Sequence, residues 1–170
     1  DGYRSLSALS SQIQTDPDRE ARALQGVPLH ALRAHREGLI CLTGGRCGYA
    51  WRSLAAGMDD AAHRFLGRLC GIYGPEETYV SLELHGPDDA PLVAALDAKA
   101  GFLGLKTVAV QPIYALTPED KVRLRLLAAI DRNCRLEAVP PEVLPDGGDA
   151  RIDVHWLDAT DLANRFGDYP

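Results

Sequence analysis

An apolar run that ends in a pair of glycines constrains the fold of this chain more than any other feature. Residues 39 to 42 (Leu-Ile-Cys-Leu) are apolar, Gly44 and Gly45 follow, and a helical pattern resumes from Tyr49 to Ala56. A short apolar run bounded by glycines is typical of a strand buried on both faces, and a helix directly after it is the βα unit of a parallel sheet. The turn lies where α/β proteins place their chemistry, but no carboxylate, histidine or cysteine occupies either glycine position.

The alternation of strand and helix continues along the chain. We expect further strands at residues 79–84, 107–110 and 152–156. We expect helices up to residue 14 and at residues 28–35, 49–56, 59–73, 88–102, 117–130 and 159–166, with a polar break at 15–22 and a surface loop at 132–149. This rhythm predicts an α/β fold with a parallel sheet, either open or part of a barrel, because four strands are too few to close one.

Composition favours an ordinary soluble, single-domain protein of 170 residues. No apolar run approaches the ~20 residues that span a bilayer, and the first residues do not open a signal peptide, so we expect a cytoplasmic location and no membrane partner. The cysteines lack the close spacing of a zinc or redox motif and are expected to be reduced, mostly buried thiols. Acidic residues outnumber basic ones by 24 to 18, and the net charge of −6 would repel a nucleic-acid backbone.

Five segments follow one another along nearly the whole chain: Tyr3-Arg4-Ser5-Leu6 and residues 38–56, 80–86, 100–120 and 154–170. Together they resemble the PHP domain of the bacterial DNA polymerase III alpha subunit family. Tyr3-Arg4-Ser5-Leu6 resembles the family's G-Y-R-N-L helix, and residues 38–56 resemble its G-L-I-x-L-S-G-G-R-x-G segment and the helix after it. Residues 80–86 resemble a strand that ends in L-E-L, and residues 100–120 resemble the family's L-G-L-P-V-V-A-T-N-D-V-H-Y region. Residues 154–170 resemble a strand and helix that end in F-A-D-Y-P.

The resemblance implies a partial PHP-type fold, a distorted βα barrel of mainly parallel strands alternating with helices. Residues 1–170 would be a single domain that lacks the family's N-terminal strands, including its His-x-His strand. Many members hold metal ions at their strand ends. Here Gly45 stands where metal-binding members have cysteine, Pro112 where they have aspartate and Tyr114 where they have histidine. None of the three is a usual metal ligand, so we expect neither a metal nor a catalytic residue in this segment.

The function implied by the resemblance is that of a portion of a DNA polymerase III alpha-like protein, a bacterial DNA-directed DNA polymerase of replication or translesion synthesis. Such nucleotidyltransferases use two metal ions, here expected to be Mg²⁺, on palm carboxylates that would lie beyond Pro170 in the family's order. This segment would bind no cofactor. It would be a non-catalytic scaffold that supports the polymerase core or docks a proofreading exonuclease subunit, with other replisome subunits as partners and DNA reached only through the parent protein.

Two alternatives remain open. One is a stand-alone, metal-less PHP-like binding or assembly protein whose open sheet edge is covered by dimerisation. The other is a residual metal-dependent phosphoesterase in which His85 works with Glu83 or Asp88. His85 follows the second expected strand, where a histidine in a loop is usually only solvated, and His155 is expected on the last strand with one face exposed.

The glycine turn is also a candidate anion site. Gly44, Gly45 and Arg46 precede a helix, and free backbone N–H groups together with the helix dipole favour negative charge. The alternative is a tight turn in which the glycines allow the backbone to pack closely.

Overall fold

The computed structural model describes residues 1–149 and 151–169. The chain divides into two compact units, the first formed by Asp1–Ser81 with Ala95–Val108 and the second by Leu82–Ala94 with Ala109–Pro170. The expectation of a single domain stays a prediction. Pro170, which ends the last of the five resembling segments, lies outside the described residues.

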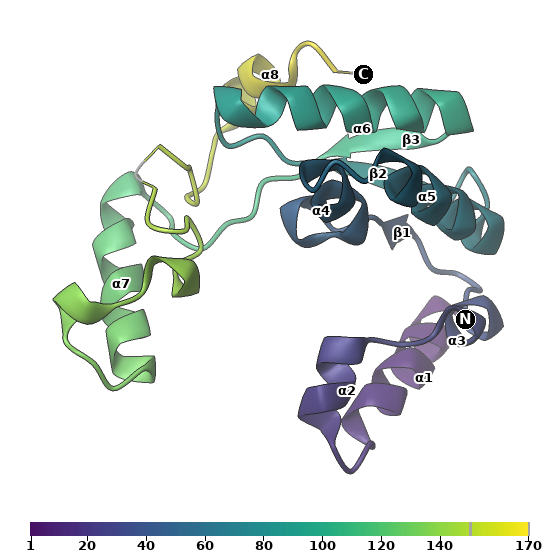
Figure 1. Ribbon diagram of the computed structural model, residues 1–170, viewed down its shortest axis with the longest axis horizontal. Coiled ribbons are helices and arrows are strands. Elements are labelled where there is room, and N and C mark those ends of the chain that lie inside the picture. Colours follow the sequence, from purple (N-terminus) through teal and green to yellow (C-terminus); the bar gives the residue numbers. More distant parts are fainter. Residues whose placement is uncertain (150, 170) are drawn as a thin grey trace. The chain divides into compact units, whose positions relative to one another are not determined.

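The helices begin and end close to the residues that the sequence pattern predicts (Figure 1). The last helix has a clear local start signal, since the Asp158 side chain accepts a hydrogen bond from the backbone N–H of Asp161 at 2.8 Å and so caps it. The predicted helices are α1 (Gly2–Gln14), α3 (Leu29–Ala34), α4 (Tyr49–Ala55), α5 (Asp59–Tyr73), α6 (Ala90–Leu103), α7 (Lys121–Asp131) and α8 (Ala159–Phe166).

One further helix and several short turns were not predicted. The polar run at 15–22 contains the start of α2 (Arg19–Gln25), so the expected break is wrong there. The carboxylate of Asp18 accepts the backbone N–H of Ala21 at 3.3 Å, and this cap lets a polar sequence begin a helix. The short 3₁₀ turns are η1 (Gly45–Cys47), η2 (Pro87–Asp89), η3 (Pro118–Asp120), η4 (Leu136–Ala138) and η5 (Pro141–Val143).

Within the described residues, three strands form a parallel sheet in the order β1-β2-β3. β1 (Cys41–Leu42) pairs in parallel with β2 (Thr78–Leu82), with Cys41 opposite Thr78. β3 (Lys106–Ala109) follows α6, as expected for a βαβ crossover. The α/β prediction is therefore confirmed at the level of fold class.

β1 differs from the strand that the sequence predicts. Only two of the four apolar residues pair with β2, and the side chains of Ile40 and Leu42 are 63% and 57% exposed. The prediction of burial on both faces is wrong for the described residues, because β1 is the edge of the sheet and no element covers the side on which Ile40 and Leu42 lie. The other side is better covered, since Thr43 is buried and its hydroxyl accepts the backbone N–H of Ser81 at 2.9 Å.

The core of the first unit is built on one face of α5. Ala62, Leu66, Leu69 and Ile72 recur at helical spacing and are all buried, and α5 packs against α4, where Trp51 is buried (Figure 1). By contrast, the apolar face predicted for α1 is buried only at Leu9 among its four expected residues. Tyr3 and Leu6 are exposed, and Ile13 is half-buried.

The last predicted strand, 152–156, is reduced to an isolated parallel bridge between Ala115 and His155. Side chains take the backbone carbonyls that a strand would offer to a neighbour: the Lys121 ammonium donates to the Ile152 oxygen at 2.5 Å, and the Gln111 amide donates to the Asp153 oxygen at 2.8 Å. The expected full strand is therefore wrong.

The cysteines are free thiols, but the prediction that most are buried is wrong. Cys41, Cys70 and Cys134 are half-buried and Cys47 is exposed. Burial nonetheless raises the pKa of the Cys41 thiol above its usual value. In the described part of the chain, none of the helices combines the length and the apolar character needed to cross a membrane.

Candidate functional site

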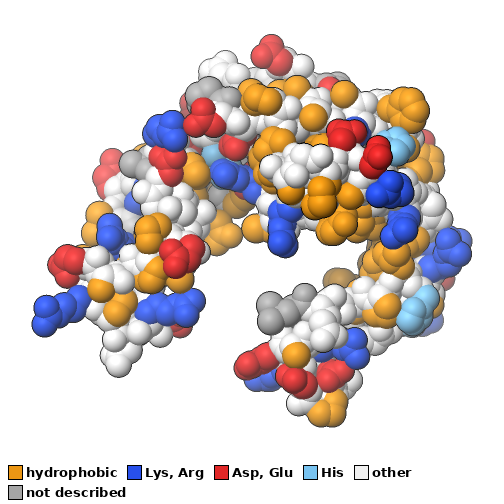
Figure 2. All heavy atoms as spheres, viewed as in Figure 1, with side chains coloured by type: hydrophobic (Ala, Val, Ile, Leu, Met, Phe, Trp, Pro, Cys, Tyr) orange, Lys and Arg blue, Asp and Glu red, His pale blue; other side chains and the backbone are white. Residues whose placement is uncertain are grey.

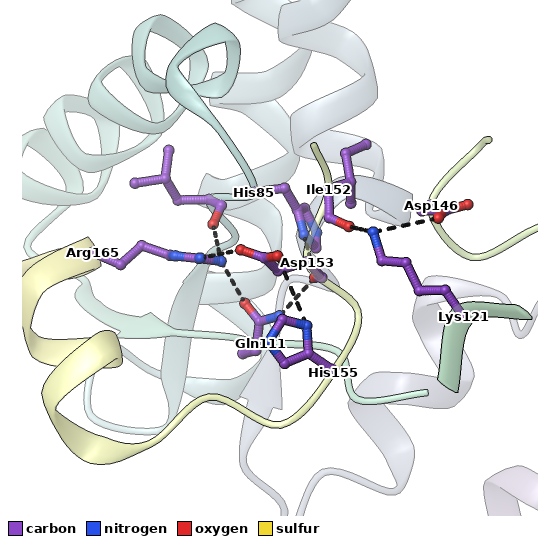
Figure 3. A network of polar contacts seen from close by, with 9 residues as sticks. His85, Gln111, Lys121, Asp146, Ile152, Asp153, His155 and Arg165 are labelled. Carbon is purple, nitrogen blue, oxygen red and sulfur yellow. Dashed lines mark hydrogen bonds and ion pairs between the residues drawn. The ribbon is translucent and has the colours of Figure 1, made fainter. Parts of the chain in front are cut away.

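A network of polar contacts in the second unit gathers side chains at the end of β2 (Figure 3). His85 and Glu83 come from the chain directly after β2, Gln111 follows β3, Asp153 and His155 come from the bridge segment, and Arg165 comes from α8. These residues are far apart in the sequence, so only the fold brings them together.

His85 is buried, contrary to the prediction that it is solvated. Its side chain is 4% exposed and that of its neighbour Glu83 is 9% exposed. The ring Nε2 of His85 lies 2.6 Å from Oε1 of Glu83, and the ring Nδ1 lies 3.1 Å from the backbone oxygen of Asp153. The backbone N–H of His85 donates to the carboxylate of Asp89 at 3.0 Å.

The partners of His85 determine where its protons are. A backbone carbonyl oxygen only accepts, so the hydrogen bond to Asp153 requires a hydrogen on Nδ1. A second proton must then lie between Nε2 and the Glu83 carboxyl group, because two acceptors do not hydrogen-bond at 2.6 Å. Both ring nitrogens are therefore engaged by protein oxygen atoms, one from a side chain and one from the backbone.

Arg165 joins three segments of the network (Figure 3). Its guanidinium lies 2.5 Å from the Asp153 carboxylate and also donates to the Leu84 backbone oxygen at 3.3 Å and to the Gln111 side-chain oxygen at 3.4 Å. The charge of Arg165 is thus balanced by Asp153. This arrangement fixes α8 against the end of β2 and leaves little net positive charge to attract an anion.

His155 lies beside this network with one ring nitrogen unsatisfied. Within the described residues, Nδ1 of His155 is buried without a hydrogen-bond partner, and Oδ1 of Asp153 is 3.8 Å away. An open cavity of about 590 Å³ adjoins it, lined among others by His85, Asp153, His155, Asp161, Asn164 and Arg165. Acidic and basic groups share the wall of the cavity, so its charge selects no single ligand class.

The predicted partners of His85 are brought together only in part. Glu83 contacts His85, but Asp88 does not: it is exposed and lies 3.2 Å from Arg151. It is Asp89 that contacts the backbone of His85. Arg151 also binds Asp149 at 2.8 Å, and its hydrogen bonds lower the pKa of Asp149 to about 2.

The three positions that we expected to replace the family's metal ligands belong to different units. Gly45 is buried at the start of η1 in the first unit, whereas Pro112 and Tyr114 are in the second. Tyr114 is 57% exposed and contributes a backbone N–H to the Val154 oxygen at 2.8 Å. Among the described residues, no group of three or more His, Cys, Asp or Glu side chains is arranged to hold a metal ion.

The glycine turn has the geometry of a tight connection. Gly44 adopts a left-handed conformation with φ of 88°, which only glycine adopts without strain. The guanidinium of Arg46 lies 6.0 Å from the centre of the Trp51 ring, within cation–π range. The anion-binding role of Gly44, Gly45 and Arg46 stays a prediction.

Several residues of the network were missed by sequence reasoning. Gln111, Asp153 and Arg165 carry no local motif, and their contacts span segments that only the fold brings together. The pairing of Glu83 with His85 had a local signal, since residues two apart on an extended chain share a face.

The comparisons with known proteins bear on the whole chain rather than on this network. No family model matches the chain. The sequence is 27% identical over 145 residues to the DNA polymerase III subunit alpha of Bacillus subtilis (strain 168). The match covers 85% of this chain but only 12% of that protein. The chain is therefore related in sequence to a DNA polymerase III subunit alpha, of which it spans a small part.

Proposed function

We propose that this chain is part of a DNA polymerase III alpha-like protein and acts there as a non-catalytic scaffold. The observation that carries the proposal is the match to the Bacillus subtilis subunit, which extends over 85% of this chain and 12% of the relative. A match that extends over most of a chain supports a relationship better than a match to one short motif, and the small share of the relative supports a part of a larger protein.

The fold that we propose for the segment is a partial PHP-type barrel. Three parallel strands alternate with helices, and the parallel bridge between Ala115 and His155 continues the pattern beyond β3. The exposed apolar side chains of Leu42 on edge strand β1 and of Ile40 directly before it support a covering element in the parent protein, because neighbouring exposed apolar side chains often mark a contact surface.

The scaffold role is supported by what the site residues can do chemically. Gly45, Pro112 and Tyr114 supply no imidazole, thiolate or carboxylate. Both ring nitrogens of His85 are already engaged. Polymerase chemistry on two Mg²⁺ ions would belong to carboxylates outside these residues. A proofreading exonuclease and other replisome subunits are the proposed partners, and the cytoplasm is the proposed location.

Primer extension tests this proposal. The polypeptide that carries this sequence, purified at its native length, is expected to extend a primed DNA template with nucleoside triphosphates and Mg²⁺, whereas the 170-residue chain alone incorporates nothing. Absence of template-directed extension by the native-length polypeptide would contradict the relation to the polymerase. Extension by the 170-residue chain would contradict the scaffold role.

A residual phosphoesterase is the second candidate, because His85 contacts the Glu83 carboxyl group and also lines a cavity. It requires His85 to release one of its two partners to bind a metal or substrate. Hydrolysis of p-nitrophenyl phosphate with added Mn²⁺ or Zn²⁺ distinguishes the candidates. Hydrolysis that is lost in His85→Gln but kept in His30→Gln, a change at an exposed residue of α3, would favour the phosphoesterase; we expect no hydrolysis in any of the three proteins.

A further inference from the structure

Helices α4 and α5 in the first unit share an aromatic pair at the surface. The rings of Tyr49 on α4 and Phe65 on α5 have centroids 4.8 Å apart and are inclined at 46° to each other. The Tyr49 side chain is 53% exposed and Phe65 is half-buried. Aromatic side chains that are partly exposed in this way offer the apolar contact area that anchors partners at protein interfaces.

Three exposed arginines flank this pair. Arg52 follows Tyr49 by three residues on α4, and Arg68 follows Phe65 by three residues on α5, so each lies about one helical turn from its ring. Arg64 precedes Arg68 by one turn. Among the described residues, no carboxylate forms an ion pair with any of these three arginines. Figure 2 shows Lys and Arg side chains beside apolar ones over the part of the molecule where Figure 1 labels α4 and α5. We call these five residues the α4–α5 patch.

The acidic residues of the same segment do not cancel the charge of the patch. The chain from residue 45 to residue 73 has four arginines and two aspartates, Asp59 and Asp60. Asp59 pairs with Lys99 of α6 at 2.6 Å. Asp60 lies five residues before Phe65, roughly 140° around the helix from it, and so on the other side of α5 from the aromatic pair.

The elements around α5 carry charges of both signs. Helix α3, which packs against α5, brings the exposed Arg33 and Arg36, and Glu37 follows them. Beyond the end of α5, Glu76 pairs with Lys106 at 2.5 Å, and Glu77 stands beside it. The net positive charge of the patch is therefore local, within a chain whose net charge is −6.

We propose that the α4–α5 patch binds an acidic peptide segment of a partner protein. An apolar side chain of the peptide would contact the rings of Tyr49 and Phe65, and its carboxylates would pair with Arg52, Arg64 and Arg68. The planar guanidinium of arginine suits carboxylates, and tyrosine and arginine are enriched among residues that contribute most to binding. A nucleic acid fits less well, because its phosphates would extend beyond the patch and meet an acidic protein. The proposal stands independently of the polymerase relationship.

Fluorescence anisotropy tests the charged and the apolar parts of this contact separately. The polypeptide that carries this sequence, at its native length, is titrated into three labelled probes of equal negative charge. The probes are a peptide of alternating glutamate and leucine, a peptide of alternating glutamate and serine, and an oligothymidylate. Arg64→Glu combined with Arg68→Glu is the test variant. Arg4→Glu combined with Arg19→Glu is the matched control, because it makes the same change of charge at exposed arginines of α1 and α2.

The expected result is binding of the glutamate-leucine peptide that the test variant weakens several-fold and the control variant leaves unchanged. Arg52→Glu, on the other helix, is expected to weaken it as well, and the glutamate-serine peptide is expected to bind less tightly. Absence of binding, or equal loss in the test and control variants, would overturn the proposal. Equal affinity for the two peptides would overturn the role of the aromatic pair. Oligothymidylate binding that the test variant weakens as much as peptide binding would instead assign the patch to nucleic acid.

Discussion

The side chains of Glu83 and His85 form a deeply buried contact in the candidate site. Their side chains are 9% and 4% exposed and meet at 2.6 Å, and Asp153 holds the other ring nitrogen of His85. A buried pair of this kind contributes little to the free energy of folding, because the cost of desolvation offsets the attraction between the two groups. Removal of one partner is costly, because the other is then buried without a hydrogen bond. At the scale of single residues, His85 thus connects the chain directly after β2 to the segment that precedes α8.

Glu83→Ala is expected to lower the free energy of unfolding by about 3 kcal/mol, because it leaves Nε2 of the buried His85 ring without its hydrogen-bond partner. Urea denaturation followed by circular dichroism measures the effect. Glu76→Ala is the matched control, since Glu76 pairs with Lys106 at 2.5 Å on the surface, where screening by water leaves such a contact without measurable effect. Equal stability of the two variants would show that the His85 contact does not hold the site together.

Sequence reasoning reached only the local half of this site. Glu83 and His85 share a face because they are two residues apart on an extended chain, and that proximity follows from the sequence alone. The burial of His85 does not follow, because it depends on Asp153 and on Arg165, which arrive from later segments. The same reason explains why Asp88 rather than Asp89 was predicted as a partner of His85. Nothing in the sequence alone distinguishes these two neighbouring aspartates.

At the scale of elements, helices were predicted better than strands for a physical reason. The bounds of α5 and α8 follow from caps and apolar periodicity within each segment. A strand needs a partner strand along its length. In residues 152–156, the backbone oxygens of Ile152 and Asp153 instead contact the side chains of Lys121, Gln111 and His85. The apolar run at 39–42 likewise forms a strand only where β2 lies beside it.

The turn between β1 and α4 depends on close packing at Gly48. A Cβ atom there would lie 2.1 Å from the backbone oxygen of Thr43, and a backbone atom cannot move aside as a flexible side chain can. We expect Gly48→Ala to destabilise the fold by about 1–3 kcal/mol, measured as the shift of the urea midpoint.

Gly67→Ala is the control for this prediction. Gly67 lies inside α5 and nothing approaches its Cβ position within 4 Å, so alanine is expected to stabilise the helix by about 0.5–1 kcal/mol. Opposite signs for the two substitutions support the packing of the turn. A neutral or stabilising effect of Gly48→Ala would show that Thr43 and Gly48 are not in close contact.

At the scale of the whole molecule, the chain forms two compact units and exposes apolar side chains at β1. It covers 12% of the related polymerase subunit. The α/β class followed from the rhythm of strand and helix patterns. The placement of the family's metal positions at Gly45, Pro112 and Tyr114 rests on the resemblance and stays a prediction.

The size of the native polypeptide tests the central claim most directly. An antibody raised against these 170 residues is used to blot a lysate of the source cells. The polymerase relationship predicts a single band far larger than 18.4 kDa, as expected for a protein of which this chain is a small part. A single band near 18.4 kDa would contradict it and would leave a free-standing α/β scaffold or binding protein as the better account.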